Sequence, residues 1–326
     1  MSYVDEDADP QSHRLKGRAL EAVAREFASS GVRTLVVSGV LGIELMDFYA
    51  EQLGPFNPIF VRLTLSQGEL RRRLASRGEY AEEWAGVEEH ARRLESAKLG
   101  HPVVETEPGA PAEVAARVLQ VVKGLVDEDR ASPRTVGTGV GRDHDGDSQA
   151  LLVGGTTAVG KSTIGWQVFR AARERGQRSA FMDLRQLGFI GVDGGVIDHG
   201  LQARVASALW RVFRAHGARF LILNGPVNTS AELVEYRAAL ANTPLKAIRL
   251  TAQRSALIQR VRARLRGEMA ALAGDPLVGR PAAETEGIVD AALRRQNQAE
   301  VDSSFPTLDT TTLDPVESAR RILAGL

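Results

Sequence analysis

Short apolar runs alternate with amphipathic segments through the second half of the chain. The expected elements, in chain order, are a strand at 150–154, a helix at 161–174, a strand at 178–183, a helix at 201–216, and strands at 219–224 and 247–251. Alternation at this spacing is typical of right-handed crossovers and a mostly parallel sheet covered by helices on both faces. The pattern therefore predicts an α/β fold for this half.

The first half repeats the order of motifs found later in the second half. Paired segments, in order, are 31–39 (GVRTLVVSG) with 217–225 (GARFLILNG), 61–64 with 248–251, 70–77 with 257–264, and 101–106 with 305–310. A helix expected at 18–29 matches 201–216, but nothing upstream matches residues 150–183. Because chance similarity would not keep this order, we predict a partial internal duplication that starts partway into the fold.

The segment between the halves, residues 127–149, is rich in charged residues, Gly, Pro and Ser, and is typical of a flexible linker. We therefore expect a degenerate domain at 1–126, a linker at 127–149 and a complete domain at 150–326. Residues 1–130 carry 16 basic and 22 acidic groups, whereas residues 131–326 carry 25 and 19. An anionic ligand should prefer the second half, and the opposite charges suit packing of one domain on the other.

Composition excludes several kinds of site. With 41 basic and 41 acidic residues, the chain lacks the positive field of a nucleic-acid-coating or membrane-adsorbing protein. It has no Cys, which excludes disulfides and thiolate sites, and its six His never fall at the spacing of a helical metal site. Neither a secretory signal nor an apolar run of roughly 20 residues is present, so we expect a cytoplasmic protein.

The segment GTTAVGKS, followed by Thr163, fits the phosphate-binding P-loop (Walker A) pattern, and it lies between an expected strand and an expected helix. Its candidate nucleotide-binding residues are Gly155, Thr156, Thr157, Ala158, Val159, Gly160, Lys161, Ser162 and Thr163. The glycines let successive N–H groups face a phosphate, and the following helix adds its positive end. Lys161 would reach the β- and γ-phosphates, and Ser162 would offer its hydroxyl to Mg²⁺.

Asp183 and Arg185 follow the second expected strand, where a doubly wound sheet opens its ligand crevice. A carboxylate there can accept a proton or anchor the metal, and a guanidinium can clamp an anion. Alternatively, Asp183 caps the next segment and Arg185 is a solvated surface residue. Asn224 ends the strand at the Walker B position, where many NTPases have Asp, and Gly225 either leaves room for a close approach or forms a plain turn.

Arg260 and Arg264 lie on one face of an expected helix, from which they can reach phosphates. The same charges could instead form a solvated face. Asp198 and His199 follow a Gly-rich stretch and are either substrate contacts or part of a turn and helix cap.

Residues 150–326 resemble the small P-loop kinases of the adenylate-kinase-like type, a group that includes gluconate, shikimate, adenylylsulfate and chloramphenicol kinases. The resemblance rests on the P-loop, on Asp183 and Arg185, on Arg260 and Arg264 as a lid-like pair, and on 308–310 with Pro315, which look like an adenine-packing loop. It implies a P-loop kinase-like parallel sheet sandwiched by helices, ATP and Mg²⁺ as cofactors, and Ser162 and Asp183 at the metal. The first half resembles the later part of the same fold, with Arg73 and Arg77 retained.

Two functions are consistent with these patterns. The first is a kinase that moves the γ-phosphoryl of ATP to a hydroxyl or phosphate of a small molecule, with catalysis by Lys161, Asp183, Arg185, Arg260 and Arg264. The second is an ATP-binding regulatory or scaffold protein with slow or no turnover, which Asn224 and the degenerate half favour. In both, the first half is a companion domain that packs on the second, and the chain can form a homo-oligomer.

Overall fold

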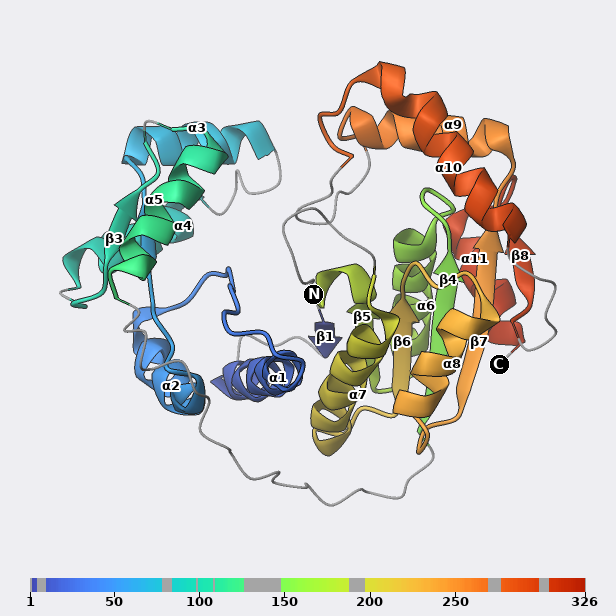
Figure 1. Ribbon diagram of the computed structural model, residues 1–326, viewed down its shortest axis with the longest axis horizontal. Helices are drawn as coiled ribbons and strands as arrows, with labels where there is room; N and C mark the ends of the chain where they lie inside the picture. The colour runs from blue at the N-terminus through green and yellow to red at the C-terminus, as the bar shows by residue number, and fades with distance from the viewer. Residues whose placement is uncertain are drawn as a thin grey trace. The chain divides into compact units, whose positions relative to one another are not determined.

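The computed structural model describes residues 2–4, 10–77, 84–97, 99–107, 109–125, 148–187, 197–268, 277–298 and 305–325 (Figure 1). The chain divides into two units, one formed by Met1–Val32 with Gly139–Leu326 and one formed by Arg33–Thr138. We call them the P-loop unit and the companion unit. The division differs from the expected domain boundaries, which placed residues 1–126 together. Most of the expected linker, residues 127–149, lies outside the described residues.

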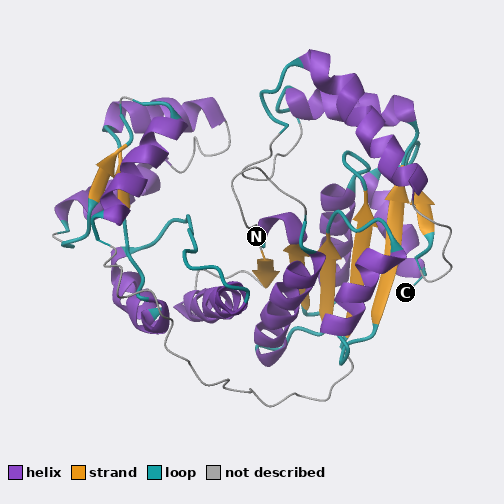
Figure 2. Cartoon of the chain, viewed as in Figure 1, coloured by secondary structure: helices purple, strands orange, loops and turns teal. Residues whose placement is uncertain are grey.

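The P-loop unit is built on a six-stranded sheet in the order β1-β5-β6-β4-β7-β8 (Figure 2). Its strands are β1 (Ser2–Val4), β4 (Gln149–Gly155), β5 (Ser179–Asp183), β6 (Phe220–Asn224), β7 (Leu245–Thr251) and β8 (Thr307–Asp309). The pairings among β4 to β8 are all parallel, and only β1 pairs antiparallel, along the free edge of β5. The parallel α/β sheet predicted from the sequence is therefore confirmed, with the strand that precedes the P-loop at its centre.

Helices cover both faces of this sheet, as Figure 1 shows. The helices of this unit are α1 (Pro10–Ser29), α6 (Lys161–Glu174), α7 (His199–Ala215), α8 (Ser230–Ala239), α9 (Arg254–Leu265), α10 (Thr285–Gln298) and α11 (Pro315–Ala324), with short 3-10 turns at Leu184–Gln186 and Ala282–Glu284. Alternate residues of β4 explain the two layers: Ala150 and Leu152 join a core with α7 and α8, whereas Leu151 and Val153 join a core with α6, α9, α10 and α11. A strand buried on both faces needs the continuous apolar run that β4 has.

The N-terminal segment belongs to the P-loop unit because it pairs and packs there. β1 continues the sheet beyond β5, and α1 lies against α7. Phe27 of α1 is buried in the same core as Phe213 of α7. Arg204 of α7 donates to the Ser30 hydroxyl (2.9 Å) and lies 3.7 Å from the Glu26 carboxylate.

The companion unit has a two-stranded parallel sheet with helices around it. Its elements are 3-10 turns at Ile43–Leu45 and Gly54–Phe56, α2 (Met46–Gln52), β2 (Arg62–Thr64), α3 (Gln67–Arg77), α4 (Trp84–Ser96), β3 (Val103–Glu105) and α5 (Pro111–Lys123). Arg62 lies opposite Val103 in this sheet, and the Thr106 N–H donates to the Thr64 carbonyl oxygen (2.7 Å). The repeat predicts a strand at 35–38, matching the one at 219–224, and this prediction is wrong: residues 32–42 form no helix or strand, and Val36 and Val40 are more than four-fifths exposed.

No helix in the described part of the chain is both long enough and apolar enough to cross a membrane.

Candidate functional site

The P-loop connects the central strand β4 to helix α6 through a backbone that needs small residues. Gly155, Ala158 and Gly160 have φ values of 133°, 65° and 100°. A Cβ atom at Gly155 would overlap the backbone of Leu250, so the strained conformation and the close approach both require glycine there. Ala158 adopts the left-handed region without that freedom, which costs about 1 kcal/mol and is typical of functional loops.

The N–H groups of this loop are available for a ligand. None of the N–H groups of residues 157–163 donates to another group within the described part of the chain, whereas the Gly155 N–H is bound to the Val227 carbonyl oxygen (2.8 Å). The first N–H groups of α6 are included in this free set, and they carry the positive end of the helix dipole. Consecutive free N–H groups around a helix start form an anion site.

Lys161 lies at the start of α6 and folds back over the loop. Its Nζ donates to the Thr156 carbonyl oxygen at 2.5 Å. Burial, reinforced by the positive charges of Arg185, Arg264 and Arg295 and opposed by Asp183, lowers the Lys161 pKa from 10.5 to about 7. Because the charged form of Lys161 is disfavoured here, a bound anion would stabilise it.

Ser162 and Asp183 meet across the loop. The Ser162 hydroxyl donates to Asp183 Oδ2 at 2.8 Å, and Asp183 Oδ1 accepts the Arg185 N–H at 3.0 Å. β5 and β6 are in parallel register, with Asp183 beside Asn224, and this brings the end of β5 to the carboxyl edge of the sheet near the P-loop. Asp183 therefore caps the turn Leu184–Gln186, which is one of the two roles considered for it, and it also binds the P-loop serine. Its action as a proton acceptor or metal anchor stays a prediction.

Asn224 lies buried next to this pair, with neither amide atom hydrogen-bonded within the described residues. Its side chain packs on Gly165 of α6, where a Cβ atom would overlap the amide. A buried unpaired amide costs about 1–3 kcal/mol, so the position has polar capacity left for water or a ligand. The neighbouring Gly225 is needed because a Cβ atom there would overlap the Leu184 side chain.

Arg260 and Thr310 hold the back of the P-loop. Arg260 donates to the Thr310 hydroxyl (3.0 Å) and carbonyl oxygen (2.6 Å) and to the Ala158 carbonyl oxygen (3.4 Å). The Thr310 hydroxyl lies 2.9 Å from the Val159 carbonyl oxygen. Arg260 is half-buried, and burial lowers its pKa. In this structure it supports the loop, and its predicted action on phosphates stays a prediction.

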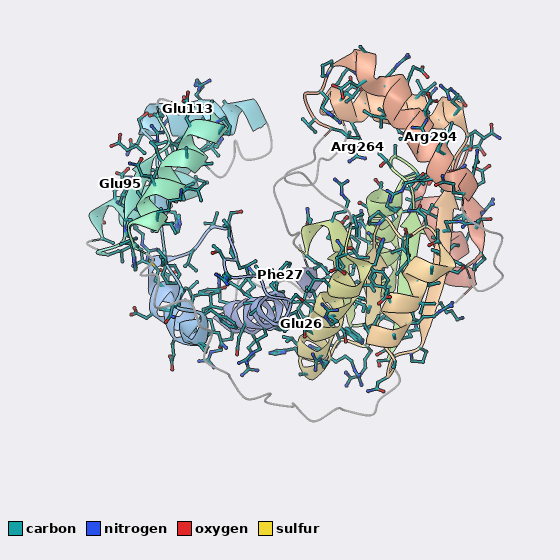
Figure 3. The ribbon with its side chains drawn as sticks, in the orientation of Figure 1. Glu26, Phe27, Glu95, Glu113, Arg264 and Arg294 are labelled. Carbon is teal, nitrogen blue, oxygen red and sulfur yellow. The ribbon has the colours of Figure 1, made fainter. Side chains whose placement is uncertain are left out.

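Further arginines surround Lys161 from other elements. Arg185 comes from the 3-10 turn after β5, Arg264 from α9 and Arg295 from α10, and all three charges act on the Lys161 ammonium. Figure 1 shows α9 and α10 beyond the ends toward which the parallel strands point, and Figure 3 shows Arg264 and Arg294 on these two helices. Sequence reasoning missed Arg295 and the loop-supporting role of Thr310.

Asp198 and His199 take structural positions. Asp198 caps α7 by accepting the Leu201 N–H (2.8 Å), and His199 lies 3.2 Å from the Tyr236 hydroxyl and 3.5 Å from Glu232. Burial alone would raise the Glu232 pKa, but hydrogen bonds from His199 and from two backbone N–H groups lower it to about 2. This cluster ties the start of α7 to the start of α8.

The residues present fit a nucleotide that arrives with a divalent cation. The described residues hold no group of three or more His, Asp or Glu side chains that could bind a metal ion by themselves. Ser162 and Asp183 provide a hydroxyl and one carboxylate, which suits Mg²⁺ because this ion takes few protein ligands and fills the rest with phosphate and water. The free N–H groups of the loop suit the phosphates.

No protein-family model matches the chain, and no curated protein sequence matches it. Among solved structures it is similar to a sugar kinase from Janibacter sp., with 17% identity over 54% of this chain and 93% of that one and a TM-score of 0.36. It is also similar to a gluconokinase from Sinorhizobium meliloti (15% identity, 55% and 91% covered, TM-score 0.35). A third similar structure is the Mycobacterium tuberculosis APS kinase in complex with AMPPNP and APS. The identity is 14%, the match covers 55% of this chain and 96% of that one, and the TM-score is 0.33. These three proteins are kinases, and the likeness concerns the fold alone.

Proposed function

We propose that the protein is an ATP- and Mg²⁺-dependent phosphotransferase that moves the γ-phosphoryl group to a hydroxyl or phosphate of a small molecule. The observation that carries the proposal is the P-loop, whose N–H groups from residue 157 to 163 make no hydrogen bond to any described residue and lie next to Lys161 and the Ser162–Asp183 pair. Kinase-like solved structures agree with this proposal at the level of fold.

In this proposal each side chain has a defined task. Loop N–H groups and the Lys161 ammonium bind the phosphates and stabilise negative charge on them during transfer. The Ser162 hydroxyl and the Asp183 carboxylate would hold a bound Mg²⁺ ion, which would supply positive charge to neutralise the phosphates. Alternatively, Asp183 accepts the proton of the acceptor hydroxyl, because its carboxylate lies at the end of β5 where acceptors approach such sheets. Arg264 and Arg185 neutralise the remaining anionic charge.

The test is ATP consumption by the wild-type protein and by Lys161→Ala, with a panel of hydroxylated metabolites and antibiotics as acceptors. ADP formation that depends on an acceptor and is lost in the variant supports the kinase. Tight ATP binding without a response to any acceptor contradicts it.

Asn224 favours a second candidate, an ATP-binding regulatory protein with slow or no turnover. A neutral amide is a weaker partner for hydrated Mg²⁺ than a carboxylate, and here the amide replaces the acid expected at the end of β6. Asn224→Asp distinguishes the two: a protein limited by this amide should hydrolyse or transfer phosphate faster with Asp, whereas an evolved kinase should not gain. The space beside Gly165 that holds the amide also fits a carboxylate, because the two side chains are nearly the same size.

We further propose that the companion unit is a degenerate partial copy of the P-loop unit. Two sheet pairings support this, since Arg62 opposite Val103 corresponds to Arg249 opposite Thr307 in the sequence alignment. Thr106 and Thr310 donate equivalent bonds, each with its N–H to the carbonyl oxygen of the preceding paired strand.

The copy differs from its counterpart at the lid-like arginines. Arg73 corresponds to Arg260, but it pairs with Glu69 (2.7 Å), and Glu69 occupies the position of Ala256. Its carboxylate also binds Arg72, and these two hydrogen bonds lower the Glu69 pKa. An arginine already paired with a local acid is a poor phosphate ligand, so this unit should not bind nucleotide. The expected cytoplasmic location, packing of the two units and homo-oligomer remain predictions.

A further inference from the structure

The space beside the P-loop carries more positive than negative charge. Lys161 is acted on by three arginines, Arg185, Arg264 and Arg295, and by one carboxylate, Asp183. A nucleotide–Mg²⁺ complex brings about two net negative charges, so it leaves part of this positive charge uncompensated. An anionic second ligand would compensate this excess positive charge.

Arg185 is the cation best placed for that second ligand. Its backbone N–H is bound to Asp183 Oδ1 at 3.0 Å, and Asp183 Oδ2 is bound to Ser162 at 2.8 Å, so its Cα position is tied to the P-loop through one carboxylate. Arg260 cannot take this role as it stands, because its guanidinium already binds Thr310 and the loop.

The Arg185 side chain has no ion pair or hydrogen bond within the part of the chain that the structure describes, and it is exposed. Two other exposed arginines of the P-loop unit pair with acidic side chains. Arg254 binds Glu286 and Asp290, and Arg280 binds Glu284. The Arg185 guanidinium, in contrast, has no acidic partner among the described residues and lies two residues from Asp183, so it is available for a ligand there.

We propose that the phosphoryl acceptor carries an anionic group, a carboxylate, phosphate or sulfate, and that Arg185 binds this group. The guanidinium forms two parallel, charge-assisted hydrogen bonds with such planar or tetrahedral anions. A neutral polyol has no charged acceptor and cannot form this pair of bonds. With the anion on Arg185, the acceptor lies on the side of the P-loop formed by the end of β5, where Asp183 is located. The inference rests on the proposed function and names the substrate class of the same site.

The test measures binding of inorganic sulfate to the full chain saturated with AMPPNP and Mg²⁺, by isothermal titration calorimetry at low ionic strength. Saturation keeps sulfate out of the P-loop itself. Arg185→Gln should weaken sulfate binding about tenfold or more, as expected for loss of charge-assisted hydrogen bonds. The sulfate affinity of Arg185→Lys should lie between those of the wild type and Arg185→Gln, because lysine keeps the charge and loses the bidentate geometry.

Arg175→Gln is the matched control. It removes the same charge from an exposed arginine without a partner among the described residues, but at the other end of α6 from the P-loop. It should leave sulfate binding unchanged. A thermal melt of each variant checks that it is folded.

A second comparison uses D-gluconate and D-sorbitol, which share a six-carbon polyol and differ by one carboxylate. Gluconate should bind the loaded protein more tightly than sorbitol, and Arg185→Gln should abolish the difference. Sulfate affinities that are equal in Arg185→Gln and Arg175→Gln, absence of sulfate binding by the loaded wild type, or equal binding of the two polyols would each overturn the inference.

These outcomes are separable from failure of the proposed function. If AMPPNP does not bind, or binds equally to wild type and Lys161→Ala, the proposed function fails before sulfate is added. If AMPPNP binds through Lys161 and sulfate does not depend on Arg185, only the anionic acceptor is excluded.

Discussion

Replacing Lys161 by methionine should stabilise the nucleotide-free protein while it abolishes nucleotide binding. The wild-type ammonium sits among arginines with one carboxylate near it, and its pKa falls from 10.5 to about 7. Methionine has a similar length and no charge, so it removes the charge without leaving a large cavity. A residue retained at the expense of stability is typical of a binding site.

The pKa shift sets both the sign and the size of the effect. Between pH ~7 and ~10.5 the unfolded chain binds a proton at Lys161 that the folded protein does not, so the free energy of unfolding rises with pH in this window and is lowest below it. A shift of roughly three to four units corresponds to about 4–5 kcal/mol. Because Lys161 retains some solvent exposure, we expect a gain of about 2 kcal/mol for Lys161→Met at pH ~7.

The assay is urea unfolding followed by tryptophan fluorescence in a Trp84→Phe background. The remaining tryptophans, Trp166 and Trp210, both lie in the P-loop unit, so the signal reports this unit. Stability is compared for the parent protein, Lys161→Met and Lys161→Arg at pH ~7 and ~9.5, and AMPPNP binding is measured in parallel.

Two results would refute the reasoning. The first is a Lys161→Met protein no more stable than its parent at pH ~7. The second is a gain of the same size at pH ~9.5, where the wild-type lysine in the folded state is already neutral and most of the difference should have disappeared. Lys161→Arg should show no pH dependence from this position, because arginine stays charged throughout.

Three further predictions concern the support of the site. Thr310→Val removes the hydroxyl next to the Val159 carbonyl oxygen and the acceptor of Arg260, so AMPPNP affinity should fall about tenfold by calorimetry with little change in melting temperature; unchanged affinity would show that the loop needs no such support. Gly225→Ala should lower the free energy of unfolding by about 1–3 kcal/mol in urea, since its Cβ atom overlaps Leu184, and a neutral result would mean that the turn yields easily. Phe27→Ala should lower the stability of the P-loop unit by about 3–5 kcal/mol in the Trp84→Phe background; stability equal to that of the parent would contradict the packing of α1 on this unit.

Much of the P-loop unit follows from local pattern. The helix predicted at 161–174 is observed with those bounds, and the predicted strands end at Asp183, Asn224 and Thr251 as observed. Hydrophobic periodicity and the P-loop spacing extend over a few residues, so they predict an element independently of the path of the rest of the chain. The proximity of Asp183 to the P-loop also followed, because the carboxyl ends of parallel strands share one edge of a sheet.

Contacts between distant segments were decided only by the tertiary structure. β1 and α1 pack with the P-loop unit because β5 offers an edge and α7 an apolar face, and the N-terminal sequence by itself indicates neither. Residues 32–42 carry a strand-like pattern yet form no strand in the described structure, since a strand needs a partner and local pattern cannot provide one. Likewise, the sequence determined which arginines exist near the site, but only packing decided that Arg260 supports the loop while Arg185 stays available.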